Sequence, residues 1–148
     1  MRILTVILAL AALCGCGGKQ EQPIDLLARE VTFPNGAKIT AVPAQTQLEV
    51  LQGLRYYDTL APDRGMLFIY AKPEPHPFWM YQAKFPVDII WIDRDFKIIE
   101  MSLNTQPCNT AAHDCPTYGG QHDSRYVLEI KAGIAAQNNL RIGDRLEF

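Results

Sequence analysis

Aromatic, amide and carboxylate side chains lie close together in one short stretch of this chain, at Trp79, Tyr81, Gln82 and Asp88. An aromatic wall with one acid is typical of surfaces that stack on a sugar or another planar ligand. Because neighbouring side chains of a strand point to opposite faces, we expect Trp79 and Tyr81 on one face and Met80 on the other. The stretch therefore predicts a small-molecule binding face. In the alternative interpretation Trp79 and Met80 are core residues and Asp88 accepts hydrogen bonds from backbone amides.

Further carboxylates offer two other kinds of site. Asp93 and Asp95 could join Asp88 in holding a cation, but they occupy an expected turn, where Asp commonly bonds its own backbone. They also lack the ligand pattern of an EF-hand, so we expect turn residues and no metal site. Asp88 or Glu129 could instead act as a general acid or base in an envelope enzyme that acts on a glycan or another polar substrate.

Cysteine and histidine side chains come together between residues 108 and 122. Cys108, His113, Cys115 and His122 carry donor atoms that suit zinc, but their spacing matches no zinc motif. Thiols outside the cytoplasm tend to oxidise, so an exported chain with this pair is expected to form a Cys108–Cys115 disulfide. Closing so short a loop should stabilise the domain by about 2.5 kcal/mol. The two histidines are then loop residues.

The remaining motifs favour a non-enzymatic protein. Ser102 and Ser124 are the only serines, and neither lies in a Gly-x-Ser-x-Gly elbow. The chain has no phosphate-binding loop, dinucleotide fingerprint or HExxH sequence, so we expect no cofactor and assign no catalytic residue. Arg55, Asp58 and Arg64 could bind an anionic group, but we favour a solvated ion pair worth under about 1 kcal/mol.

The first residues are typical of a bacterial export signal. Arg2 precedes an apolar run over residues 3–13, which is about half the length that a membrane-spanning helix needs. The run ends in Leu-Cys-Gly-Cys, the pattern of a lipobox, which predicts cleavage after Gly15 and lipid attachment at Cys16. The alternative is an ordinary secretory signal with two incidental cysteines.

This N-terminus divides the chain into a signal peptide (1–15), a lipidated cysteine with a flexible tether (16–25) and a single mostly-β domain (26–148). We expect a membrane partner through the lipid on Cys16 and a location in the cell envelope, facing the periplasm or the cell exterior. Gly17 stands where an aspartate would favour inner-membrane retention, so we expect the outer membrane in a Gram-negative cell. The formal net charge of −2 argues against a nucleic-acid partner. The remaining candidate partners are a small molecule and an envelope protein. In the second case the domain would be a protein–protein interaction module.

Short segments with β-like patterns dominate the rest of the chain. Two β-branched runs, at residues 87–92 and 97–101, flank an acidic turn and predict a hairpin. The other expected strands are residues 38–42, 65–70, 78–81, 126–130 and 145–148. Pro43 is expected to end the first of these.

Helical signals are few. Thr46 and Glu49 match a capping box, and Gly53 is placed to end that helix after about two turns. A second short helix is expected over residues 133–138, and residues 104–124 are expected to form a long loop. Many short strands with one or two short helices predict a mainly β fold, a compact single domain like a β-sandwich or barrel.

Five ordered blocks carry a resemblance to a known family: GMLF (65–68), FWM (78–80), PVDIIWID (86–93), YVLEIKAG (126–133) and IGDRL (142–146). In this order they resemble the domain of unknown function 192 family (DUF 192), and the insert between Cys108 and Cys115 resembles its exported, lipoprotein-type members. The resemblance implies a compact β-sandwich-like domain without an established catalytic activity.

The chain also departs from the family pattern at two places. Arg55 stands where the family usually has Met, and Tyr81-Gln82-Ala83 stands where it usually has Lys-Asn-Thr. Any ligand contact that the family makes with that Asn and Thr is therefore not expected here. We expect a non-enzymatic binding or accessory domain of the cell envelope, with an enzyme and an interaction module as the alternatives.

Overall fold

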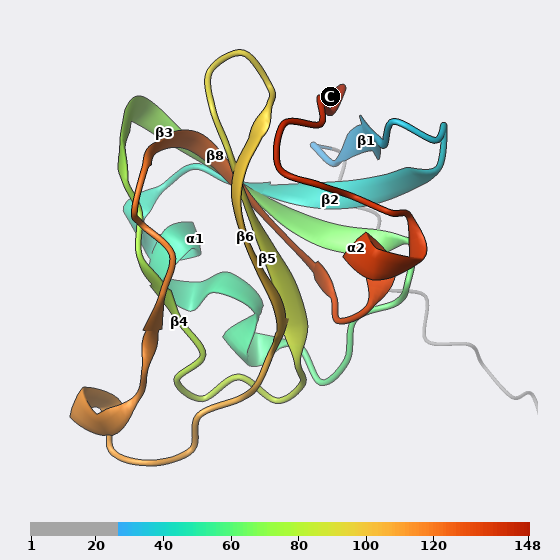
Figure 1. Ribbon diagram of the computed structural model, residues 1–148. Helices are drawn as coiled ribbons and strands as arrows, with labels where there is room; N and C mark the ends of the chain where they lie inside the picture. The colour runs from blue at the N-terminus through green and yellow to red at the C-terminus, as the bar shows by residue number, and fades with distance from the viewer. Residues whose placement is uncertain (1–26) are drawn as a thin grey trace, which may run out of the picture.

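Most of the protein is one six-stranded sheet of mixed direction (Figure 1). The computed structural model describes residues 27–148. Neighbouring strands are antiparallel except β2 and β3, which run parallel. The strands follow the order β1 (Arg29–Thr32), β2 (Lys38–Ala44), β3 (Arg64–Pro75), β8 (Asp123–Lys131), β5 (Val87–Ile92) and β6 (Ile98–Thr105). The prediction of a mainly β single domain is confirmed.

The parallel pair explains where the first helix lies. Parallel neighbours need a crossover connection, whereas antiparallel ones can be joined by a tight turn. The crossover from β2 to β3 contains α1 (Gln47–Gln52) and the 3-10 turn η1 (Gly53–Tyr56). These two elements lie against one face of the sheet, so the topology places a helical cover over part of that face (Figure 1).

Both faces of the sheet are buried because two hydrophobic clusters cover them. In β5, Ile89 and Trp91 belong to the cluster beneath α1 and η1, whereas Ile90 and Ile92 belong to the cluster on the opposite face. Strand alternation produces this division. The second cluster includes Leu146 near the C-terminus.

Both predicted helices are confirmed. The Thr46 Oγ1 accepts a hydrogen bond from the Glu49 amide (3.3 Å), and the Glu49 carboxylate accepts one from the Thr46 amide (2.8 Å), which completes the capping box. Gly53 follows as the C-cap. The second helix, α2 (Ile134–Gln137), is shorter than expected.

The hairpin is confirmed, but two other strand predictions need correction. β2 runs past Pro43 to Ala44. Because β1 pairs with β2 only as far as Ala41, Pro43 lies at a free edge, where its missing amide hydrogen breaks no hydrogen bond to β1. Residues 145–148 do not form a regular strand. They make single bridges, Lys97 to Arg145 and Thr32 to Glu147, which join the two ends of the sheet in a barrel-like closure.

The long loop predicted over residues 104–124 contains more structure than expected. It holds the 3-10 turn η2 (Ala112–Asp114) and β7 (Thr117–Tyr118), which pairs with β4 (Phe78–Trp79). β4 is shorter than the strand predicted over 78–81. The predicted disulfide between Cys108 and Cys115 is present, and its loop projects from the domain (Figure 1).

The predicted signal peptide (1–15) and the lipidated Cys16 with its tether (16–25) lie outside the described residues. Among residues 27–148, no helix has both the length and the apolar character that a membrane crossing requires.

Gly119 provides a sharp test of the core, because a Cβ atom there would lie 2.1 Å from Cζ2 of the fully buried Trp91. We expect Gly119→Ala to lower the free energy of unfolding by about 2–4 kcal/mol, from overpacking and the left-handed backbone (φ +63°) together. Gly36→Ala is the control, since its φ is also positive (+83°) but its Cβ would meet open space. It should lose only about 1 kcal/mol. Urea unfolding of both variants measures the difference, and equal losses would contradict the packing argument.

Candidate functional site

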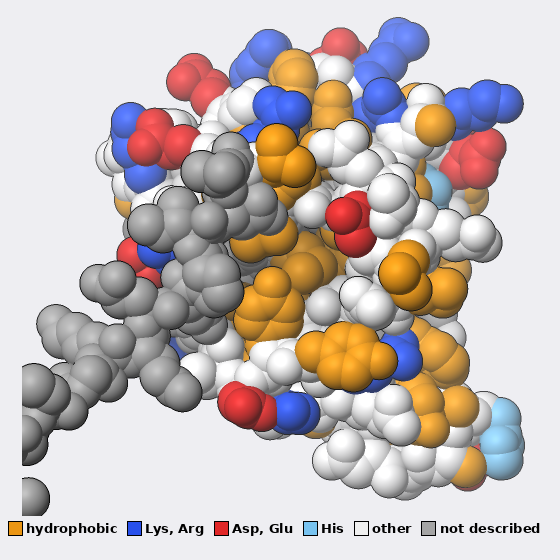
Figure 2. Space-filling model, turned by 180° about the vertical axis from the view of Figure 1, so that it is seen from behind, with side chains coloured by type: hydrophobic (Ala, Val, Ile, Leu, Met, Phe, Trp, Pro, Cys, Tyr) orange, Lys and Arg blue, Asp and Glu red, His pale blue; other side chains and the backbone are white. Residues whose placement is uncertain are grey.

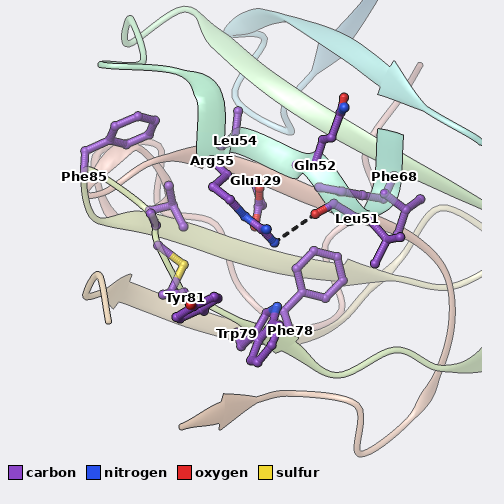
Figure 3. A pocket seen from close by; sticks show the side chains of 15 residues that line it. Leu51, Gln52, Leu54, Arg55, Phe68, Phe78, Trp79, Tyr81, Phe85 and Glu129 are labelled. Atoms are coloured by element: carbon purple, nitrogen blue, oxygen red, sulfur yellow. Dashed lines mark hydrogen bonds between the residues drawn. The ribbon is translucent and has the colours of Figure 1, made fainter. Parts of the chain in front are cut away.

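A pocket opens on the sheet face that α1 and η1 cover, between these elements and residues 78–85 (Figure 3). The open space within the pocket and at its mouth amounts to about 500 Å³. Hydrophobic side chains also reach the surface across the middle of the face seen in Figure 2. The pocket walls are mainly apolar and aromatic, with Leu51, Leu54, Phe68, Phe78, Trp79, Met80, Tyr81, Phe85 and Val87.

Glu129 lies at the inner end of this pocket. It belongs to β8, a central strand, where it is opposite Met66 of β3 and Ile89 of β5. Its side chain is only 6% exposed, and burial raises the pKa of its carboxyl group to about 8. The carboxyl group makes no hydrogen bond or ion pair with any residue between 27 and 148. At neutral pH it is therefore mostly protonated and has a hydrogen-bond donor to offer.

Arg55 brings a positive charge to the wall of the pocket. One guanidinium nitrogen, Nη2, donates a hydrogen bond to the Leu51 carbonyl (2.9 Å), shown dashed in Figure 3. The guanidinium carbon also lies 6.0 Å from the centre of the Tyr81 ring. The solvated ion pair expected among Arg55, Asp58 and Arg64 is not found between residues 27 and 148, where Asp58 pairs instead with Lys84 (2.6 Å) at the exposed surface.

The structure brings together two of the four candidate binding residues. Trp79 and Tyr81 both line the pocket with ring centres 5.3 Å apart. Trp79 is 47% exposed, whereas Met80 between them is buried, as alternation predicts. Gln82 lies beside the pocket and its Nε2 donates to the Tyr81 hydroxyl at 3.3 Å.

Asp88, the fourth candidate, lies away from the pocket. It is buried on the opposite face of the sheet, where Oδ1 accepts from the Asn104 amide (2.8 Å) and Oδ2 from the Ala135 amide (3.0 Å). The carboxylate thereby ties α2 and β6 to β5. The alternative interpretation, in which Asp88 bonds backbone amides, describes this geometry.

Sequence reasoning weighed Glu129 only as a catalytic group and did not place it in the binding face. A signal was present, because Val127 and Glu129 alternate on one face of a strand otherwise occupied by core residues. An acidic residue on the core face of a central strand is rare unless it has a partner. The sequence contained no comparable sign that α1 and η1 form the opposing wall of the pocket, because their position depends on the crossover from β2 to β3.

Neither hypothesis of a metal site has support among residues 27–148, where no group of three or more candidate ligands is found. Cys108 and Cys115 are bonded to each other and so are not available as zinc ligands. His113 is exposed beside Asp114 (3.4 Å). The Asp93 carboxylate accepts from the amides of residues 95 and 97 (2.8 and 2.9 Å), which confirms its turn role.

Glu129 should make the stability of the domain depend on pH. Its pKa is about 8 in the folded state and 4.5 as an ordinary carboxyl group, so between these values the folded state holds a proton that the unfolded chain has released. Stability should therefore fall as pH rises from 4.5 through 8. Glu129→Gln cannot ionise, and we expect it to be more stable than the native chain by about 4–5 kcal/mol at pH 9. Urea unfolding from pH 4 to 9 tests this, and parallel curves for the two proteins would contradict it.

Comparison with known proteins places the chain in a family. A crystal structure from Sinorhizobium meliloti 1021, described as that of a "putative transcription regulator", is 30% identical with a TM-score of 0.70. The likeness covers 80% of this chain and 89% of that one. A protein of unknown function from Novosphingobium aromaticivorans DSM 12444 is 25% identical with a TM-score of 0.75, over 95% of this chain and 99% of that one. No curated protein matches.

The pattern of one family covers nearly the whole described domain. It matches residues 30–148, which include every block on which the resemblance was noted and every pocket residue. The chain therefore belongs to the DUF192 family, described as Uncharacterized ACR.

Proposed function

We propose that this protein is a lipid-anchored, non-enzymatic binding protein of the cell envelope whose pocket takes a small amphipathic molecule. One observation carries the binding role: the buried carboxyl group of Glu129 opens into an apolar pocket without a partner among residues 27–148. Moving a carboxyl group largely out of water without a protein partner opposes folding, so such a group is retained most readily where a ligand or water can form hydrogen bonds with it.

The rim of the pocket supports an amphipathic ligand. Leu51 of α1 is 63% exposed and Trp79 is 47% exposed, and both line the mouth. A ligand that covers them removes apolar surface from water, while its polar group can reach Glu129 or Arg55. The pocket thus offers an apolar contact surface and two polar groups, which is the composition of small-molecule sites.

An envelope enzyme is the second candidate, because the raised pKa of Glu129 suits a general acid or base near neutral pH. Asp88 does not suit this role, since backbone amides occupy both of its oxygens. Incubation with glycan and peptidoglycan fragments, followed by mass spectrometry, separates the two candidates. The enzyme requires product formation that Glu129→Gln abolishes, and the binding protein leaves every fragment intact.

The anchor is argued from the lipobox that ends at Cys16. Residues 17–27 span at most about 40 Å even when fully extended, so a lipid on Cys16 would hold the pocket close to a membrane surface. The negative net charge and the proposed export signal both argue against transferring to this chain the role of "putative transcription regulator" that describes the S. meliloti relative.

Two leucines of α1 allow a matched test of the pocket. Leu51 lines it and Leu48 does not, yet their exposed fractions are almost equal at 63% and 64%. The test uses residues 24–148, because the matched S. meliloti chain folds with little outside this domain. Calorimetric titration with decanoate, decanol and decyltrimethylammonium should show binding of at least one of these. Leu51→Ala should weaken that binding about fivefold through lost apolar contact.

Leu48→Ala should leave the affinity unchanged. If the two variants behave alike, or if none of the three compounds binds, the proposed binding function at this pocket is wrong.

Lipid attachment gives an independent prediction. Expressed in a Gram-negative host with radiolabelled palmitate, the full chain should carry the label and sediment with membranes. Cys16→Ser should lose both the label and signal cleavage, because the acceptor thiol is gone. Cys14→Ser is the control, since that cysteine would leave with the signal peptide, and it should be labelled normally. Label on the Cys16→Ser chain would contradict the anchor.

A further inference from the structure

We propose that the pocket selects an amphiphile with a single carboxylate head, which Arg55 and Glu129 receive while Leu51, Phe78 and Trp79 cover the apolar tail. This inference rests on the proposed binding function and names the ligand class of the same site. It is argued from the positions of the two polar groups, the sign of the charge in the pocket and the shape of its apolar wall.

Arg55 and Glu129 approach the pocket from different elements. Arg55 comes from η1 on the wall, and Glu129 comes from the central strand β8 at the inner end (Figure 3). The two side chains form no ion pair with each other, and burial is what raises the pKa of Glu129, with no neighbouring cation lowering it. Both side chains line the same pocket, so a ligand bound there has access to both of them.

Both groups are hydrogen-bond donors at neutral pH. The Arg55 guanidinium uses one of its donors on the Leu51 carbonyl and makes no other hydrogen bond with the described residues, so most of its five N–H groups remain available. Glu129, mostly protonated, offers its O–H. Two donors in one pocket require an acceptor, and a carboxylate supplies two acceptor oxygens whose hydrogen bonds to such donors are charge-assisted and short.

The charge of the pocket selects against a cationic head. Arg55 is always protonated, and no other lining side chain carries a positive charge. A cation would meet the charge of Arg55 and would need Glu129 to lose its proton in an apolar environment. An anionic head instead pairs with Arg55 and leaves Glu129 neutral.

The apolar wall defines the rest of the ligand. Phe78, Trp79 and Leu51 line the pocket, and Leu51 and Trp79 are largely exposed at its mouth. These side chains can cover an alkyl chain or a ring system. The head reaches inward toward Glu129 and the tail lies toward the exposed rim.

Glu129 is the group that changes charge near neutral pH. The other titratable side chains that line the pocket are Arg55 from η1 and Tyr81 after β4, while β5 contributes the uncharged Val87. Tyr70 of β3 lies close enough to Glu129 to interact with its charge. Burial and the charge of Glu129 hold the pKa of Tyr70 well above its usual range. Above pH 8 an ionised Glu129 would repel a carboxylate head, so binding should weaken there.

The experiment titrates residues 24–148, with the disulfide formed, at pH 6.5 with three ten-carbon probes that differ only in the head. These are decanoate, decanol and decyltrimethylammonium. Decanoate should bind at least tenfold more tightly than the cation. Arg55→Met should remove most of the preference for decanoate over decanol, and Lys84→Met, which removes an exposed cation outside the pocket lining, should leave it intact.

A second measurement follows decanoate binding from pH 6.5 to 9.5. The affinity of the native domain should fall about tenfold across this range, whereas that of Glu129→Gln should stay constant. If the cation or decanol binds as tightly as decanoate, the carboxylate preference is wrong and the binding function stands. If none of the three probes binds, the binding function itself is wrong and the preference fails with it.

Discussion

The parallel pairing of β2 with β3, in a sheet that is otherwise antiparallel, decides where a ligand could enter this fold. Parallel neighbours cannot be joined by a tight turn, so the chain must cross one face of the sheet before β3 begins. That crossover carries α1 and η1, which cover only part of the face. Residues 78–85 cover another part, and the pocket is the space that these two covers leave between them.

Two buried acidic residues in adjacent strands, Asp88 and Glu129, differ in whether the protein supplies their hydrogen-bond partners. Both carboxylate oxygens of Asp88 in β5 accept hydrogen bonds from backbone amides, one in β6 and one in α2, so this residue stabilises the packing of these elements. Glu129 of β8 lies on the opposite face, is nearly as buried, and opens into the pocket without a partner among residues 27–148. A carboxyl group that is largely removed from water and has no protein partner opposes folding, so Glu129 is the acidic residue for which we propose a ligand contact.

The proposed lipid anchor and the pocket rest on separate parts of the chain. The lipobox ends at Cys16, and the pocket draws on residues 50–87 and on Glu129. A short tether would keep the pocket at a membrane surface, where single-chain amphiphiles partition. Arg55 gives this member of the DUF192 family a charged pocket wall.

The sequence by itself determined the local features of this protein: the capping box at Thr46, the hairpin of β5 and β6, the Cys108–Cys115 disulfide and the family. Each depends on residues close together in the chain or on ordered blocks. The pocket depends instead on packing between segments far apart, which only the tertiary structure decided. Trp79 and Tyr81 could be foreseen from alternation, but whether Asp88 or Glu129 faced a cavity depended on which strand face the crossover covered. That choice follows from long-range strand order, and no local spacing encodes it.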